Sequence, residues 1–231
     1  MGTLVLPPLN RTVIRPTHGQ MARLTSGRFY TNLVLQSINQ NNASWSASGL
    51  TSRLRNATAP DGVANTATTL LEDSALNNHQ IVQNFSPVIA TRRILTFSSW
   101  FKQGAGTRFP ALIVLMNGNG QYTYQSFNLS TGAVANTGIV GNYVVLDKGI
   151  TRFFNSWFRC WFTFLTTNTD TTNSFRIILS DNGTNLSYTG DGTSSMLVWG
   201  TQIQTDAKVT NLIRTTTTQI TQEETENVYG N

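Results

Sequence analysis

The segment Tyr188-Thr-Gly-Asp-Gly-Thr-Ser-Ser-Met-Leu-Val-Trp-Gly-Thr-Gln-Ile-Gln204 decides the expected fold of this chain. It opens with a turn at Gly190-Asp191-Gly192 and continues directly into an alternating strand that begins at Met196. Glycine allows positive φ in a tight loop, and an aspartate side chain can accept a hydrogen bond from the backbone two residues further on. We therefore expect a turn that leads into a β-strand.

Short segments rich in β-branched and aromatic residues fill most of the chain after residue 33. The expected strands are residues 81–85, 93–101, 111–116, 121–127, 142–146, 156–165, 174–179 and 196–203. Turn clusters separate them, at residues 104–106, 117–120, 130–132 and 181–183. Many short strands without a long amphipathic helix predict an all-β sandwich. Within residues 64–76 we expect one helical turn.

Several segments, in the same order, resemble those of a carbohydrate-binding-like jelly-roll module found in bacteriophage tail fibres, head fibres and prophage structural proteins. They are Asn32-Leu33 with 42–45 (N-A-S-W), 59–62 (A-P-D-G) with His79, 98–104, 156–160 (S-W-F-R-C), 188–204 and 211–215. The resemblance covers roughly residues 30 to 216. It implies a jelly-roll β-sandwich in a virion protein.

Three positions depart from the pattern of that family. Ser156 stands where a glycine is usual, Ser195 replaces a loop glycine, and Gln204 replaces a terminal glutamate. Related carbohydrate-binding jelly rolls hold a structural calcium with carboxylates near the two chain ends of the module. Calcium prefers charged oxygen ligands, so the amide of Gln204 argues against that ion, and we expect no cofactor.

The two ends of the chain differ from its centre. Residues 1–29 contain three prolines that oppose regular helix, so we expect an extended N-terminal docking arm with no core of its own. Arginines of this arm are the expected virion-docking residues: Arg11, Arg15, Arg23 and Arg28. They lack a lysine run or a repeated aromatic pattern, which favours a protein partner over nucleic acid. Residues 217–231 form a short polar, acidic tail, either a second docking segment or a flexible end.

Catalytic and metal chemistry find little support in the composition. Only 12% of residues are charged, and the two histidines, His18 and His79, lack a second ligand at metal-binding spacing. The acidic residues lie mostly in turn-like contexts, and no nucleophile elbow is present. The single cysteine, Cys160, is expected to be a buried structural thiol. We expect no enzyme activity and no metal site. The longest apolar run, residues 111–116, is also far too short to span a membrane.

Aromatic residues and amides suggest a glycan-binding site. Tyr122 and Tyr124 share one face of an expected strand beside a turn that carries Asn117 and Asn119. An aromatic ring can stack on the apolar face of a sugar while amides hydrogen-bond its hydroxyls. Asp191 is a further candidate, although turn formation explains it better. The strand tryptophans, by contrast, are expected in the core: Trp100, Trp157 and Trp199.

Together these features indicate a bacteriophage virion structural protein, a small spike, head or tail fibre or decoration subunit that attaches to host surface glycans. We expect it to be made in the bacterial cytoplasm, to reside in the virion, to form a homotrimer and to contact capsid, portal or tail proteins. The main alternative is a capsid cement or tail-assembly protein that binds no glycan. A capsular polysaccharide depolymerase is the third hypothesis, since it needs only two carboxylates across a cleft.

Overall fold

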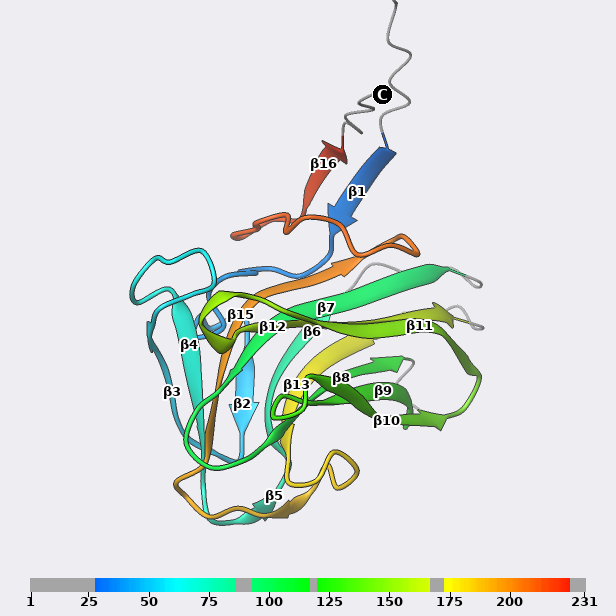
Figure 1. The fold of residues 1–231 in the computed structure, drawn as a ribbon. Coiled ribbons are helices and arrows are strands. Elements are labelled where there is room, and N and C mark those ends of the chain that lie inside the picture. Colours follow the sequence, from blue (N-terminus) through cyan, green and yellow to red (C-terminus); the bar gives the residue numbers. More distant parts are fainter. Residues whose placement is uncertain (1–27, 86–92, 117–119, 167–172, 225–231) are drawn as a thin grey trace, which may run out of the picture.

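The computed structural model describes residues 28–85, 93–116, 120–166 and 173–224. Over these residues the chain forms two antiparallel sheets packed face to face as a jelly-roll β-sandwich, together with a small separate sheet of two strands (Figure 1). The predicted fold class is confirmed. Within the described ranges, no helix has the length and apolar character needed to cross a membrane.

The larger sheet has eight strands. It runs in the order β11 (Tyr143–Arg152), β12 (Phe158–Thr166), β7 (Ile94–Gln103), β15 (Ser195–Gln204), β1 (Arg28–Asn32) and β16 (Ile220–Glu224), while β4 (Ala67–Glu72) and β3 (Leu50–Ala57) continue from β15. The smaller sheet has six strands. It runs in the order β10 (Ala133–Val140), β9 (Gln121–Asn128), β8 (Phe109–Met116), β13 (Asn173–Ser180), β6 (His79–Phe85) and β2 (Ser46–Ser48). The short strands β5 (Leu76–Asn77) and β14 (Tyr188–Thr189) pair with each other.

The helical turn expected within residues 64–76 is wrong, because strand β4 occupies Ala67–Glu72. This strand pairs with β3 on one side and with β15 on the other. Partners on both sides satisfy its backbone in the extended form, and its β-branched residues Thr68 and Thr69 favour that form. The sequence pattern also missed strands β3 and β10, in which no residue is fully buried.

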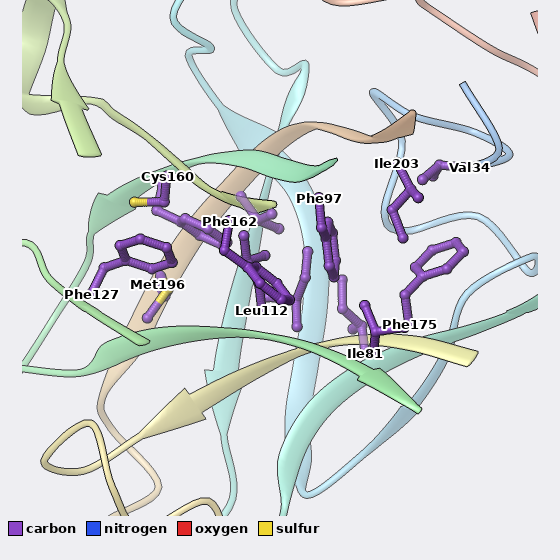
Figure 2. Close-up of a cluster of buried hydrophobic side chains, with 14 of the residues drawn as sticks. Val34, Ile81, Phe97, Leu112, Phe127, Cys160, Phe162, Phe175, Met196 and Ile203 are labelled. Atoms are coloured by element: carbon purple, nitrogen blue, oxygen red, sulfur yellow. The ribbon is translucent and has the colours of Figure 1, made fainter. Parts of the chain in front are cut away.

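The core between the sheets is built from alternate residues of strands in both layers (Figure 2). Phe97 and Phe162 come from the eight-stranded sheet, and Phe175 comes from the six-stranded one. The rings of Phe97 and Phe175 meet edge to face at 5.9 Å between centroids, across the interface of the two layers. Cys160 is fully buried in this core, and burial raises the pKa of its thiol well above the ordinary value, as expected of a structural thiol.

A second apolar cluster contains the three tryptophans expected in the core, Trp100, Trp157 and Trp199. They are buried, but Trp100 and Trp199 do not lie between the sheets. Along β7 and β15 they alternate with Phe101 and Val198, which face the core, so they point to the outer face of the eight-stranded sheet. Side chains of the surrounding loops, such as Ile38 and Leu212, pack against them there.

Strands β1 and β16 form a ribbon that projects beyond the sandwich (Figure 1). They pair with each other over five positions, whereas β1 pairs with β15 only at Asn32 and Gln204. Arg28 begins β1 and pairs in register with Glu224, and Phe29 is 68% exposed. The other predicted docking residues, Arg11, Arg15 and Arg23, lie outside the described residues.

Candidate functional site

The outer face of the six-stranded sheet carries the two predicted tyrosines, Tyr122 and Tyr124. They alternate along β9 with Thr123 and Gln125, which are buried. Because successive side chains of a strand point to opposite faces, both tyrosines lie on the same outer face. Their rings stack with 6.4 Å between centroids and 25° between planes. Tyr124 is only 7% exposed, so Tyr122 is the ring that presents more of its surface.

A glycine on the neighbouring strand gives Tyr124 its place. Gly138 of β10 pairs in register with Tyr124. A Cβ atom at Gly138 would lie 1.9 Å from a carbon of the tyrosine ring, which is well inside van der Waals contact. The ring therefore lies directly over the glycine, and burial raises the pKa of the Tyr124 hydroxyl, with a further contribution from Tyr122.

Aliphatic side chains form the floor beside these rings. Ile113 of β8 and Ile178 of β13 are almost fully buried, and Leu115, Tyr122 and Leu186 pack against them. Next to this floor the surface is hollowed to a volume of about 300 Å³. Its lining residues come from β8, β9 and β13 and from adjoining turns: Asn78, Ile113, Leu115, Gly120, Tyr122, Arg176, Ile178 and Leu186. We refer to this region as the tyrosine hollow.

Polar atoms without partners lie on the same face. Arg176 of β13 pairs in register with Val82 of β6, and Gln80 of β6 pairs with Ile178 of β13. Within the part of the chain that the structure describes, neither Nε of Arg176 nor Oε1 of Gln80 has a hydrogen-bond partner, although both atoms are buried. Burial lowers the pKa of the Arg176 guanidinium. Buried polar atoms are normally paired, so the guanidinium of Arg176, which lines the hollow, is suited to donate to acceptor atoms of a ligand.

The predicted site residues are therefore only partly brought together. Tyr122 and Tyr124 are neighbours, whereas Asn117 and Asn119 fall outside the described residues. Asp191 does not line the tyrosine hollow. Sequence reasoning missed Arg176, although a single arginine inside the apolar strand Ser174-Phe-Arg-Ile-Ile-Leu179 was a visible signal.

Asp191 instead is the exposed member of an ionic cluster centred on the buried Glu72. Arg108 donates two hydrogen bonds to the carboxylate of Glu72, at 2.6 and 2.7 Å, and one to Asp191 at 2.9 Å. The Tyr188 hydroxyl and the Asp191 backbone N–H also donate to Glu72, at 2.6 and 2.8 Å. The other contacts of Asp191 are with Thr193 and Ser194, which it caps within its own turn. The turn predicted for Asp191 is thus formed, and the cluster ties it to β4.

The charge states in this cluster follow from those contacts. Desolvation alone would raise the pKa of Glu72, but the hydrogen bonds from Arg108, Tyr188 and the Asp191 backbone outweigh it and hold that pKa below its usual value. Hydrogen bonds from Ser194 and Thr193 depress the pKa of Asp191 strongly. Burial and the bond to Glu72 raise the pKa of Tyr188 well above its usual value. Two carboxylates that share one arginine are both ionised, as a structural anchor requires.

His79 is likewise held by structural contacts. It is fully buried, with Nδ1 2.6 Å from the Gly49 carbonyl oxygen and Nε2 3.1 Å from that of Tyr188. Its ring also packs against the ring of Tyr188 at 4.5 Å. His79 therefore joins three segments that are distant in sequence.

Gln204, which stands in place of the family's glutamate, is fully buried and paired. Its amide nitrogen donates to the Lys208 carbonyl, and its oxygen accepts from the Thr210 hydroxyl at 3.0 Å. Among the residues the structure describes, no group of three or more His, Cys, Asp or Glu side chains could hold a metal ion.

No protein-family model and no curated protein matches this chain. Its fold is similar to solved structures of carbohydrate-binding modules. The CBM22-1 xylan-binding domain of Paenibacillus barcinonensis Xyn10C is 12% identical, with 80% of this chain and 99% of that chain covered and a TM-score of 0.45. The mannan-recognising module TmCBM27 is 8% identical, with 78% and 99% covered and a TM-score of 0.35.

A phage protein is also among the similar structures. The enzymatically active domain of tailspike protein 4 of bacteriophage CBA120 is 12% identical, with a TM-score of 0.41. The match covers 74% of this chain but only 21% of that one. All three TM-scores lie below 0.5, so these likenesses are distant.

Proposed function

We propose that this protein binds glycan in the tyrosine hollow and does so as a non-enzymatic attachment subunit of a bacteriophage virion. One observation carries the binding part: Tyr122 and Arg176 line the same open hollow, and within the described residues the buried Nε of Arg176 has no hydrogen-bond partner. Sugar-binding sites combine an aromatic or aliphatic surface with a few fixed polar groups, and the hollow offers both. Tyr122 supplies the ring, and Asn78 and Arg176 supply polar groups.

The size and form of the hollow support the same function. At about 300 Å³ it lies at the lower end of the range for small-molecule sites and is suited to a short oligosaccharide. Five of its eight lining residues lie on paired β-strands, which hold side chains more rigidly than loops would. Pre-ordered side chains lose little conformational freedom when a ligand binds.

The virion part of the proposal rests on the resemblance of the chain's segments to the phage jelly-roll module. Attachment to the particle is assigned to the arginine-bearing N-terminal residues Arg11, Arg15, Arg23 and Arg28. Removal of residues 1–27 is expected to abolish incorporation into particles while leaving glycan binding intact. Imaging of assembled particles, with the truncated protein beside the full chain, measures that incorporation.

The test of glycan binding uses the full chain on an array of bacterial surface oligosaccharides, followed by titration calorimetry with the best ligand. Tyr122→Ala is expected to weaken binding about tenfold or more, because stacking on the ring is lost. The matched control is Phe154→Ala, since Phe154 is 83% exposed and does not line the hollow. Equal affinities for the two variants would show that the hollow is not the site.

A second function, a capsid cement or tail-assembly protein without glycan binding, is favoured by the β1–β16 ribbon. An isolated two-stranded ribbon is only marginally stable in water, and Phe29 is exposed upon it. A protein neighbour that packs on the ribbon would cover that ring. Phe29→Ala would then weaken incorporation into the particle, whereas an attachment subunit held by the preceding arm would tolerate the change.

A further inference from the structure

Arg176 is the only charged residue among those that line the tyrosine hollow. It lies inside the sheet, on β13 between β8 and β6, where it pairs in register with Ile113 and Val82. A guanidinium among aliphatic neighbours loses much of its hydration, and burial accordingly lowers its pKa. This position is unfavourable for a cation unless an anion comes to it.

Three other arginines of the described chain have partners that Arg176 lacks. Arg108 is paired with Glu72 and Asp191, and Arg214 with Asp61. Arg159 donates to the Thr210 carbonyl and lies over the ring of Trp100. Within the described ranges, Arg176 has no ion pair, and its Nε has no hydrogen-bond partner. Arg152 also lines a hollow without an ion pair among the described residues, but it is exposed and keeps its hydration, whereas Arg176 is partly buried.

The register of the sheet fixes how Arg176 stands relative to the tyrosines. Ile113 of β8 pairs with Arg176 on one side and with Tyr124 on the other, so the three residues form one row across the sheet. Adjacent strands are about 4.8 Å apart, which places the Arg176 and Tyr124 backbones about 10 Å from each other. Tyr122 stands two residues from Tyr124 along β9, towards the next row. The arginine and the rings can therefore contact one short oligosaccharide together.

We propose, on the basis of the glycan-binding function above, that the ligand is an acidic glycan whose sugar carboxylate pairs with Arg176. The planar fork of a guanidinium matches a carboxylate with two parallel hydrogen bonds, and such pairs are stronger than neutral ones. Asn78, which also lines the hollow, offers its side-chain amide to a sugar hydroxyl. A uronic acid or a sialic acid has the required carboxylate. A neutral sugar would leave the guanidinium dehydrated and unpaired, which disfavours it.

The test compares acidic oligosaccharides with the same molecules after chemical reduction of their carboxyl groups. Fragments of polygalacturonate, hyaluronan and polysialic acid are suitable, each beside its carboxyl-reduced form, in titrations with the full chain. Reduction of the carboxyl group is expected to weaken binding by about tenfold or more. Sulfated oligosaccharides are included, and tighter binding of these than of every carboxylated form would overturn the carboxylate assignment.

Substitutions distinguish the effect of Arg176 on binding from the effect of the protein's overall charge, which is formally +5. Arg176→Gln is expected to remove the preference for the acidic form, bringing the two affinities within about twofold of each other. Arg176→Lys keeps the charge without the fork and is expected to keep only part of that preference. Arg152→Gln is the matched control, because it removes the same charge from an exposed residue that lines a different hollow.

The outcomes are distinguishable. If the protein binds neutral and acidic forms equally, or if Arg152→Gln weakens acidic binding as much as Arg176→Gln does, the acidic-glycan inference is wrong while glycan binding stands. If no glycan of either kind binds, the proposed function itself fails. Should Arg176→Gln not fold, Arg176→Lys and the reduced ligands still decide the matter.

Discussion

The outer faces of the two sheets are built from similar side chains, yet they end in opposite states. On the eight-stranded sheet, Trp100 and Trp199 are covered, with rings 5.4 Å apart, and arginines lie over both of them. On the six-stranded sheet, Tyr122 lines an open hollow, and Arg176 beside it has no counter-ion among the residues that the structure describes. Aromatic rings and arginines therefore stabilise the fold on the eight-stranded sheet, whereas on the six-stranded sheet they are accessible to a ligand.

The loops account for this difference. Arg214, which lies over Trp199, belongs to a segment that follows β15, and it is anchored at 2.8 Å by Asp61 of another loop. Ile38 and Leu212 also pack against the tryptophans. On the hollow side, Leu186 is the loop side chain that packs against the floor. Long loops cover the outer face of the eight-stranded sheet, so we expect substitutions on that face to affect folding. On the outer face of the six-stranded sheet, we expect substitutions to affect binding.

The largest effect is expected from Trp199→Ala on the covered face. The side chain is 5% exposed, and its loss should lower the free energy of unfolding by about 3–5 kcal/mol, since a large cavity forms against Trp100. Urea denaturation measures the change, with Phe154→Ala as a control that should stay within about 0.5 kcal/mol. A loss near 1 kcal/mol would mean that the loops over this face add little stability.

The two arginines sharpen the contrast. Arg159→Ala should destabilise the fold by about 2 kcal/mol, because the guanidinium lies 4.2 Å from the centroid of Trp100 and donates to the Thr210 carbonyl at 2.6 Å. Arg176→Ala should change the free energy of unfolding by less than about 1 kcal/mol, since no paired group is lost. Parallel urea titrations of both variants test this difference. Equal losses would place Arg176 among the structural arginines.

A matched pair of glycines distinguishes folding from binding. Gly138→Ala brings a Cβ atom within 1.9 Å of the Tyr124 ring, and Gly149→Ala brings one within 2.1 Å of Trp161 on the other sheet. Both should lower the free energy of unfolding by about 1–3 kcal/mol through overpacking. Only Gly138→Ala should also weaken glycan binding, because it displaces the tyrosine pair. Denaturation and calorimetry on both variants measure the two effects, and weakened binding by Gly149→Ala would contradict the assignment of the site.

We expect acid to lower the free energy of unfolding through the Glu72 cluster and not through the tyrosine hollow. Glu72 and Asp191 have pKa values depressed in the folded state, so their contribution is present above their ordinary values of 4.5 and 3.8 and is lost as the pH falls through the folded values. Unfolding free energies measured from about pH 6 down to about pH 3 should therefore decline. Glu72→Gln should decline less steeply over the same range, and an unchanged slope would show that the cluster does not couple to folding.

The sequence predicted the strands best where alternation was strong. In residues 93–101 and 121–127, β-branched or aromatic residues recur along the segment and are buried. These two segments form most of β7 and β9. Strand β10, whose pattern is Ala-Val-Ala-Asn-Thr-Gly-Ile-Val, has no such alternation, and pairing with β9 determines it. The tyrosine pair was predictable, since two residues two apart share a face. The role of Arg176 was not predictable. Whether its side chain has a counter-ion among the described residues depends on strands that are distant from it in sequence.

The smallest change in stability is expected at two serines, Ser156 and Ser195, which stand where the phage module usually has glycine. Ser156 has a φ of 61°, in the left-handed region where a side chain is strained. Ser156→Gly should therefore raise the free energy of unfolding by about 0.5–1 kcal/mol. Ser195 has no positive φ, and its hydroxyl accepts the Ala105 N–H at 2.9 Å, so Ser195→Gly should lower stability by about 1 kcal/mol. Thermal and urea unfolding of the two variants should show opposite signs; the same sign in both would mean that backbone strain at Ser156 does not govern this turn.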